Sequence, residues 1–183
     1  RFLGCDLGAV SIKAALLATG EDTDPFSGSA GPSSLWHPEP LRIHRDGGEP
    51  ATILVTEYRR TRGRPLDAAR ALLREIIEDL GGRPLDGVRV TGSGGSLLRT
   101  SLHVPEENEF RSLAAATWAV APDARTLLEI GGESSKILFL GRDPASGDMG
   151  IVDYQTNGDC AAGTGSFLDQ QAGRLQYQIE DVG

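Results

Sequence analysis

The chain opens with Arg1-Phe-Leu-Gly-Cys-Asp-Leu-Gly-Ala-Val-Ser-Ile-Lys-Ala-Ala-Leu-Leu17. It predicts two short strands joined by a tight turn, in which Gly8 supplies backbone freedom. The first strand ends in an acid, Asp6, that we expect to be exposed. The second strand carries a cation, Lys13, close to the same turn.

Strand and helix patterns alternate along the rest of the chain. Further strands are predicted at residues 52–58, 87–91, 125–130, 135–140 and 151–155, and helices from Pro65 to Leu80, from Pro105 to before Pro122, and over residues 164–175. Residues 20–50 are rich in Gly, Pro, Ser and Asp and predict a loop-rich surface insertion. Hairpins supply antiparallel pairs and helical crossovers supply parallel ones, so the order predicts an α/β domain with a mixed sheet.

Composition excludes several classes of function. The 183 residues carry a net charge of −8, which argues against a nucleic-acid partner or an anionic membrane surface. No apolar run approaches the ~20 residues that a membrane span requires, and a cytoplasmic location is expected. The two cysteines lie far apart, so no disulfide framework is predicted. Because the chain begins without Met and stops after a helix-like segment, we expect a fragment of a longer protein.

Three glycine-rich elements follow predicted strands. They are Asp6-Leu-Gly8 with Lys13, Glu129-Ile-Gly-Gly-Glu-Ser-Ser-Lys136, and Thr91-Gly-Ser-Gly-Gly95. Glycines let a phosphate approach backbone amides, and a strand-end carboxylate can hold hydrated magnesium or orient an attacking water. A single Gly-Gly is more often only a hairpin turn, but the three together indicate a nucleoside triphosphate site.

Three motifs carry a resemblance to a known family. Gly4-Cys-Asp-Leu-Gly-Ala-Val-Ser-Ile-Lys13, Leu128-Glu-Ile-Gly-Gly-Glu-Ser-Ser-Lys136 and Asn157-Gly-Asp-Cys-Ala-Ala-Gly-Thr-Gly-Ser-Phe-Leu168 resemble the activator ATPases of 2-hydroxyacyl-CoA dehydratases and the ATPase subunits of benzoyl-CoA reductases. The family belongs to the acetate and sugar kinase, Hsp70 and actin superfamily. The resemblance implies an actin-like (ribonuclease H-like) ATPase lobe over residues 1–183, with a mixed sheet flanked by helices and a second lobe beyond residue 183.

The resemblance also implies site residues. Asp6 and Glu129 would lie near magnesium or the attacking water as catalytic acids, and the phosphates of ATP would contact Gly8, Lys13, Gly131, Gly132, Glu133 and Ser134. The common activator pattern has Ser at the position of Ala9 and Gln-Asp at the position of Glu133-Ser134. These departures leave open which acid is catalytic.

Cys160 precedes the helix predicted at 164–175 by about one turn, so the positive helix end can stabilise a thiolate. Gly163 and Gly165 leave room beside it. On this chemistry alone, a metal ligand and an inert buried thiol are equal alternatives. The family resemblance implies a ligand of a 4Fe-4S cluster shared across a homodimer, with two ligands from each subunit. Cys5, which alternates with Gly4 and Asp6 in a strand, predicts a small buried thiol instead.

The resemblance implies an ATP-driven activator that passes an electron through the cluster to an acyl-CoA dehydratase or reductase, with reduced ferredoxin or flavodoxin as donor. A sugar-kinase-type phosphotransferase is the alternative from another class, and a non-catalytic ATP-sensing module is a third. ATP turnover is expected for the complete protein and is expected to be weak or absent in these 183 residues alone. Elsewhere, the Arg59-Arg-Thr-Arg62 cluster has two readings, a contact with an acidic partner and a solvated strand end, of which the second is favoured. Trp118 is expected to pack a helix against the sheet.

Overall fold

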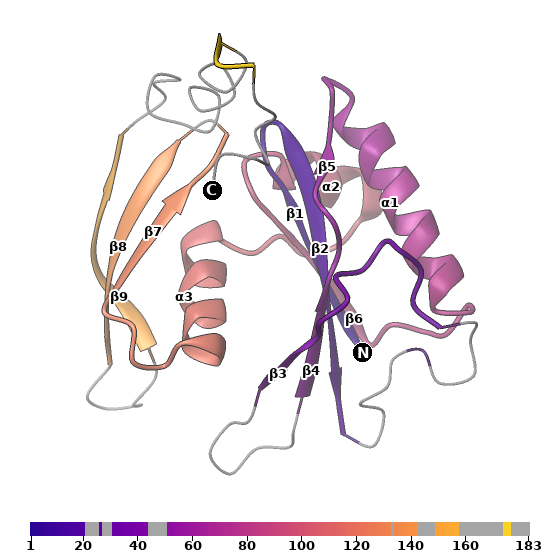
Figure 1. The fold of residues 1–183 in the computed structure, drawn as a ribbon, viewed down its shortest axis with the longest axis horizontal. Helices are drawn as coiled ribbons and strands as arrows, with labels where there is room; N and C mark the ends of the chain where they lie inside the picture. The colour runs from indigo at the N-terminus through magenta and orange to yellow at the C-terminus, as the bar shows by residue number, and fades with distance from the viewer. Residues whose placement is uncertain are drawn as a thin grey trace. The chain divides into compact units, whose positions relative to one another are not determined.

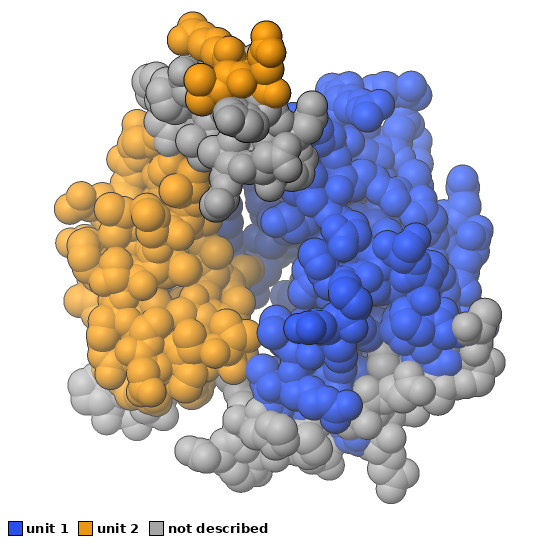
Figure 2. All heavy atoms as spheres, viewed as in Figure 1, with its two compact units in different colours: residues 1–109 blue, residues 110–183 orange. Residues whose placement is uncertain are grey.

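A computed structural model describes residues 1–20, 26, 31–43, 51–132, 134–142, 149–157 and 174–176. The chain divides into two compact units, Arg1–Glu109 and Phe110–Gly183, shown in blue and orange in Figure 2. Each is described below by itself. Among the described residues, no helix is long and apolar enough to cross a membrane.

The first unit is built on a six-stranded mixed sheet (Figure 1). Its strands are β1 (Phe2–Leu7), β2 (Ser11–Thr19), β3 (Leu41–Ile43), β4 (Ala51–Val55), β5 (Arg59–Arg60) and β6 (Gly87–Thr91). They are ordered β3-β4-β2-β1-β6, with β5 pairing to β2. Only β1 and β6 run parallel, because a helix connects the chain back to β6 while hairpins and loops join the others. The predicted mixed sheet is therefore confirmed.

Strict alternation along β1 and β2 places the core of this unit on one face of the sheet. The buried side chains are Leu3, Cys5, Leu7, Ile12, Ala14, Leu16 and Ala18. Helix α1 (Pro65–Asp79) covers this face with Ala69, Leu72 and Ile76, which recur at three- and four-residue spacing. Pro65 begins the helix, and Gly81 and Gly82, both with positive φ, follow its end as predicted.

Helix α2 (Gly95–Leu102) was not predicted, because Gly94 and Gly95 have poor helix propensity and suggest only a loop. Burial of Leu98, which is 1% exposed, in the same core overrides that local preference. Two further strands, β3 and β5, were also missed; β3 lies in the predicted insertion, where it pairs with β4.

The second unit contains α3 (Glu109–Val120), which begins at the boundary, and a three-stranded antiparallel sheet. Its strands are β7 (Thr126–Ile130), β8 (Ser135–Arg142) and β9 (Met149–Thr156), in that order. Ala114 of α3 packs with Leu138 and Leu140 of β8, and Trp118 contacts this cluster as expected. The three predicted strands are confirmed.

The start of α3 corrects the prediction that Pro105 opens this helix. Pro105 and Glu107 are instead extended beside β6, because the Val90 amide donates to the Pro105 carbonyl and the Glu107 amide donates to the Val90 carbonyl. The helix consequently begins four residues later, at Glu109. The helix predicted at 164–175 lies almost wholly outside the described residues.

Candidate functional site: two glycine hairpins

The first candidate phosphate loop is the turn between β1 and β2. The Gly8 amide donates to the Ser11 carbonyl at 2.9 Å and closes the turn. Asp6 and Lys13 are both exposed and lie opposite each other in the antiparallel register. A side chain at position 8 would meet only the Ser11 oxygens, at 3.6 Å or more, so the turn itself is uncrowded. The structure thus brings the predicted residues Asp6, Gly8 and Lys13 together at one end of the sheet.

The Thr91–Gly95 segment packs against this turn from the side of β6. Gly92 has φ +91°, and a Cβ there would lie 2.3 Å from Asp6 Oδ1 and 2.5 Å from the Leu7 carbonyl oxygen. The Gly94 amide donates to that same carbonyl at 2.7 Å. These glycines are therefore required by close packing on the end of β1, which explains the glycine-rich sequence without a ligand.

The second candidate loop joins β7 to β8. The Gly131 amide donates to the Ser134 carbonyl at 2.9 Å, and a Cβ at position 131 would lie 2.9 Å from Glu129 Oε1. A side chain at position 131 would therefore displace the Glu129 carboxylate or press on the Ser134 carbonyl, 3.0 Å away. The predicted residues Glu129, Gly131, Gly132 and Ser134 are brought together here, whereas Glu133 lies outside the described residues.

Lys136 belongs to the quoted second motif, but sequence reasoning assigned it no role. Its ammonium group lies 2.9 Å from Glu129 Oε2, and the two residues are directly opposite in the β7–β8 register. Lys136 is only 8% exposed, so the pair is held largely out of water. The sequence offered one signal for this pair, because Glu129 and Lys136 carry opposite charges and flank the Gly-Gly turn. One oxygen of Glu129 is therefore engaged by this cation.

Asn157, at the end of β9, is the second residue that sequence reasoning did not assign. The Ser135 amide donates to Asn157 Oδ1 at 2.9 Å, and the Asn157 amide donates to the Ser135 carbonyl at 3.2 Å. Ser135 directly follows the candidate phosphate loop, and Asn157 is the first residue of the cysteine motif. The two motifs are therefore joined by direct hydrogen bonds.

The two cysteines differ in what the structure says of them. Cys5 is 1% exposed, and burial, with a smaller contribution from the nearby Asp6 charge, raises the pKa of its thiol to about 12. This burial confirms the prediction of a small buried thiol and makes Cys5 unsuited to bind a cluster. Cys160 lies outside the described residues. Among the residues that are described, no group of three or more His, Cys, Asp or Glu side chains could hold a metal.

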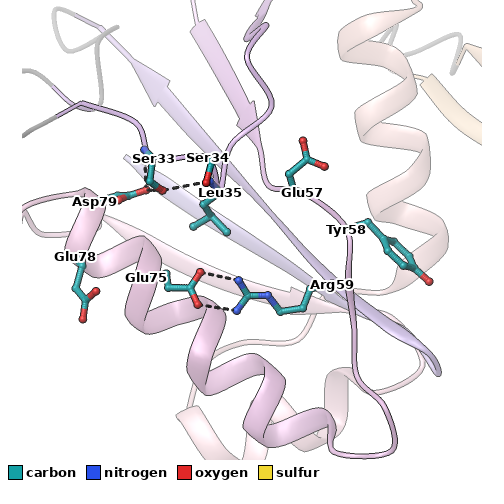
Figure 3. A pocket seen from close by; sticks show the side chains of 9 residues that line it. All are labelled: Ser33, Ser34, Leu35, Glu57, Tyr58, Arg59, Glu75, Glu78 and Asp79. Carbon is teal, nitrogen blue, oxygen red and sulfur yellow. Dashed lines mark hydrogen bonds and ion pairs between the residues drawn. The ribbon is translucent and has the colours of Figure 1, made fainter. Parts of the chain in front are cut away.

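The first unit also contains a hollow of about 440 Å³ (Figure 3). It is lined by Ser33, Ser34, Leu35, Glu57, Tyr58, Arg59, Glu75, Glu78 and Asp79, none of them a predicted site residue. Arg59 bonds both oxygens of Glu75, at 2.9 and 2.6 Å, and this partner raises the pKa of Arg59. The expectation that Arg59 is solvated is therefore wrong, because its ion pair with Glu75 links β5 to α1.

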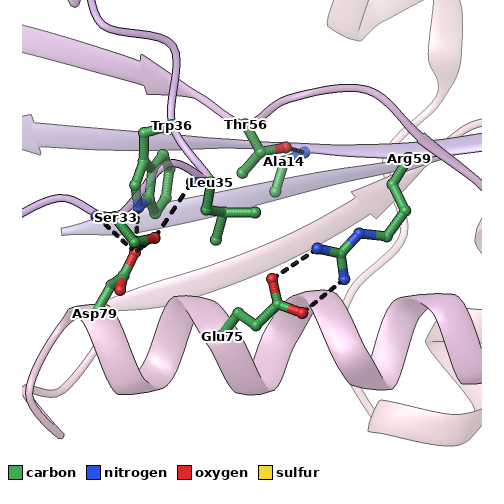
Figure 4. A network of polar contacts seen from close by, with 8 residues as sticks. All are labelled: Ala14, Ser33, Leu35, Trp36, Thr56, Arg59, Glu75 and Asp79. Atoms are coloured by element: carbon green, nitrogen blue, oxygen red, sulfur yellow. Dashed lines mark hydrogen bonds and ion pairs between the residues drawn. The ribbon is translucent and has the colours of Figure 1, made fainter.

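Asp79 fastens part of the predicted insertion to the same helix (Figure 4). Its Oδ2 accepts hydrogen bonds from Trp36 Nε1 at 2.8 Å and from Ser33 Oγ at 2.6 Å. Trp36 is 4% exposed and forms an isolated bridge with Thr56, which follows β4. Residues 33–36 are thus held against α1 and the end of β4, and two residues that line the hollow, Ser33 and Asp79, take part in this attachment.

Comparison with solved structures identifies the architecture. The chain matches the Acidaminococcus fermentans (R)-2-hydroxyglutaryl-CoA dehydratase component A with a TM-score of 0.65 at 21% identity, covering 98% of this chain and 56% of that one. It matches the Clostridium difficile 2-hydroxyisocaproyl-CoA dehydratase activator with bound ADPNP with a TM-score of 0.63 at 20% identity, covering 100% and 55%. The chain therefore shares the α/β fold of these two proteins, which agrees with the predicted fold class.

Sequence comparison finds curated proteins that are similar to this chain, although no family model matches it. It is 26% identical over 184 residues to the 2-hydroxyisocaproyl-CoA dehydratase activator of Clostridioides difficile, covering 99% of this chain and 54% of the relative. It is 36% identical over 61 residues to the (R)-2-hydroxyglutaryl-CoA dehydratase activating ATPase of Acidaminococcus fermentans, covering 33% and 21%. The chain is thus similar in sequence to activators of 2-hydroxyacyl-CoA dehydratases, and it spans about half the length of the curated relative that it matches throughout.

Proposed function

We propose that the protein containing this chain is an ATP-dependent activator that couples ATP hydrolysis to low-potential electron transfer through a 4Fe-4S cluster. The recipient would be an acyl-CoA dehydratase or reductase, and reduced ferredoxin or flavodoxin would be the donor. The observation that carries the proposal is the second hairpin. It places a glycine turn over an ion-paired acid and is hydrogen-bonded to the first residue of the cysteine motif.

The two hairpins would bind ATP and magnesium. At the first, Lys13 would neutralise phosphate charge, and Gly8 would allow the phosphates to approach the turn. Asp6 would hold the hydrated magnesium or orient the attacking water, because its carboxylate is exposed at the strand end. At the second, Gly131, Gly132, Glu133 and Ser134 would contact phosphate. Glu129, fixed by Lys136, would support that turn from below.

Cys160 would be this chain's ligand to the cluster, which when bound supplies a one-electron redox centre. Cys5 does not fit that role, because its thiol is buried and held protonated. The cluster would be shared across a homodimer, so a second ligand from each subunit is expected outside this chain. Differential contacts to ATP and ADP would bias the conformation of the complete protein.

The test is anaerobic iron and sulfide analysis with an absorption spectrum on the complete protein. We expect the parent to bind iron and sulfide, Cys160→Ser to lose both, and the control Cys5→Ala to retain them. Equal iron in the parent and in Cys160→Ser would contradict the proposal.

The nucleotide half of the proposal has its own matched pair of variants. Gly131→Ala would place a methyl group 2.9 Å from Glu129 Oε1, whereas a Cβ at Gly150 has nothing within 4 Å. We expect Gly131→Ala to weaken ATP binding at least tenfold, and Gly150→Ala to leave it unchanged, by titration calorimetry.

A non-catalytic ATP-sensing module is the second candidate, because Ala9 and Ser134 replace the Ser and Asp of the common activator pattern. A complete protein that binds ATP stoichiometrically, contains no iron and hydrolyses no ATP would support this alternative. Phosphorylation of a sugar by an iron-free protein would instead support the sugar-kinase-type reading.

A further inference from the structure

Arg60 is the member of the arginine cluster at residues 59–62 that lies beside the first glycine hairpin. Strand β5 pairs with the start of β2, where Arg59 is opposite Ile12. Ile12 is fully buried, and Arg59 accordingly reaches the core face of the sheet, where it bonds Glu75 of α1. Because successive side chains of a strand point to opposite faces, Arg60 lies on the other, exposed face.

The backbone of β5 fixes Arg60 beside the candidate phosphate loop. Arg60 is opposite Ser11, whose carbonyl accepts the Gly8 amide and closes the turn. The Thr61 amide donates to the Val10 carbonyl at 2.9 Å, so the next residue is bonded to the turn itself. Thr61 is buried, which keeps this contact away from water. The main chain at Arg60 is thus held against the turn, while its side chain extends from an exposed position.

Tyr58 brings the Arg60 side chain together with Lys13. The Tyr58 ring centroid lies 5.9 Å from Arg60 Cζ and 5.7 Å from Lys13 Nζ. Both distances are within the about 6 Å over which an aromatic ring attracts a cation. Figure 3 shows the Tyr58 and Arg59 side chains extending in opposite directions, as alternation along the strand requires. One exposed ring therefore contacts two cations at the first hairpin.

The chemistry of these two cations suits a polyphosphate chain. An Arg guanidinium presents a planar fork of N–H donors that matches two phosphate oxygens, whereas a Lys ammonium acts as a compact point charge. A polyphosphate chain carries several negative charges along its length, so it can engage both cations. The ring orients them without neutralising either one, since its attraction comes from a quadrupole and not from a net charge.

We infer that Arg60 is a further phosphate-binding residue of the first hairpin, and that Tyr58 positions Arg60 and Lys13 for the same polyphosphate chain. The inference rests on the proposed function, because it requires this hairpin to bind ATP. It divides the arginine cluster between two tasks. Arg59 links β5 to α1, and Arg60 faces the ligand.

Titration calorimetry of the complete protein tests the inference with magnesium and two ligands, ATP and inorganic tripolyphosphate. Tripolyphosphate carries the phosphate chain without the nucleoside, so it isolates contacts to phosphate. Arg60→Met should weaken the binding of both ligands about tenfold or more, because charge-assisted hydrogen bonds are lost. Arg60→Lys keeps the charge but not the fork and should weaken both by a smaller factor, about threefold.

Arg42→Met is the matched control for loss of an exposed arginine. Arg42 is exposed in β3, where it pairs with Thr52, which pairs in turn with Ala18 near the far end of β2 from Ser11. Arg42→Met should bind both ligands like the parent. Urea unfolding without ligand identifies any variant that fails to fold, and Arg60→Lys keeps the inference testable if Arg60→Met does.

The positioning role of Tyr58 has a separate test. Tyr58→Phe keeps the ring and should retain most of the ATP affinity, whereas Tyr58→Leu should weaken ATP binding about threefold. In the Lys13→Met/Arg60→Met double variant, Tyr58→Leu should cause no further loss, because the ring acts through these two cations. An equal loss in both backgrounds would overturn the positioning role.

The outcomes separate this inference from the proposed function. Parent-like affinity for both ligands in Arg60→Met and Arg60→Lys would overturn the role of Arg60, leave the proposed function intact and favour an acidic partner for the cluster. Loss of ATP affinity with unchanged tripolyphosphate affinity would overturn it too, because Arg60 would then contact the nucleoside. Failure of the parent to bind ATP would overturn both.

Discussion

The two glycine hairpins are similar in sequence and opposite in polarity. In the β1–β2 hairpin, the face packed under α1 is apolar, and the charged Asp6 and Lys13 lie on the exposed face. In the β7–β8 hairpin, the face packed under α3 includes the Glu129–Lys136 ion pair. Its exposed face instead carries apolar side chains, namely Leu128, Ile130, Ile137 and Phe139.

This difference shows that the same motif can present its charge to solvent or hold it within a packed layer. In the first hairpin, charged groups at the turn can meet a ligand directly. In the second, the charges stabilise the turn from inside, and the ligand would meet the backbone. We therefore expect substitutions in the first hairpin to act mainly on ligand binding, and those in the second to act on stability as well.

The largest effect is expected where the Thr91–Gly95 segment packs against the first hairpin. Gly92→Ala should lower the free energy of unfolding by about 4 kcal/mol, because it combines a left-handed backbone with a collision against Asp6 and Leu7. Gly31 has the same φ of +91° with nothing within 4 Å of its Cβ, so Gly31→Ala should cost only about 1 kcal/mol. Urea unfolding measures both, and equal losses would mean that packing on β1 is not the cause.

Two leucines of the second hairpin test its inverted faces. Leu138 is fully buried and Leu128 is 58% exposed. Leu138→Ala should destabilise by about 3 kcal/mol through lost burial and a cavity, and Leu128→Ala by less than about 0.5 kcal/mol. Chemical denaturation of the complete protein would reveal a covered face if Leu128→Ala costs as much as Leu138→Ala.

The Glu129–Lys136 ion pair gives a further test of the difference between the two hairpins. Lys136→Met should destabilise by about 2 kcal/mol, because it leaves the partly buried Glu129 carboxylate without its cation. Lys13→Met, at an exposed position, should cost at most about 0.5 kcal/mol. A double-mutant cycle with Glu129→Gln isolates the pair, and a coupling energy near zero would show that it contributes nothing.

The smallest effect concerns the thiol on the inner face of the first hairpin. Burial raises the pKa of Cys5 from 9.0 to about 12, so the folded state retains the proton more tightly than the unfolded state. Its contribution to stability is complete below pH 9 and is lost as the pH rises towards 12, with about 1 kcal/mol lost by pH 10. Cys5→Ala should show a shallower decline of unfolding free energy over that range, whereas identical slopes would refute the shift.

Sequence reasoning predicted α1 and every strand except β3 and β5, because hydrophobic periodicity and glycine breaks are local signals. Leu3, Cys5 and Leu7 alternate in the sequence as they do in the structure. It missed α2 and misplaced the start of α3, because burial of Leu98 and pairing of Val90 with Glu106 are decided by distant contacts. It also expected Arg59 to be solvated, because the sequence does not reveal that Glu75, one turn of α1 before Asp79, faces it.

The residues of the candidate site were likewise predictable only where the signals are local in sequence. Asp6, Gly8, Lys13, Glu129 and Gly131 were identified from turns and motif resemblance, which are local. The roles of Lys136 and Asn157 depend on which residues face each other across β7, β8 and β9, and therefore on strand register. Register follows from packing and turn geometry rather than from composition.

The attachment of Trp36 to Asp79 has a consequence for spectroscopy. The chain contains two tryptophans, and each compact unit has one, with Trp36 in the first and Trp118 in the second. Their indole rings lie in different surroundings, since Trp36 is buried with its N–H bonded to a carboxylate and Trp118 is only partly buried against α3's own cluster. With Trp36→Phe and Trp118→Phe, intrinsic fluorescence would follow the melting of each unit separately, and the two emission curves would show whether they unfold as one cooperative body or in succession.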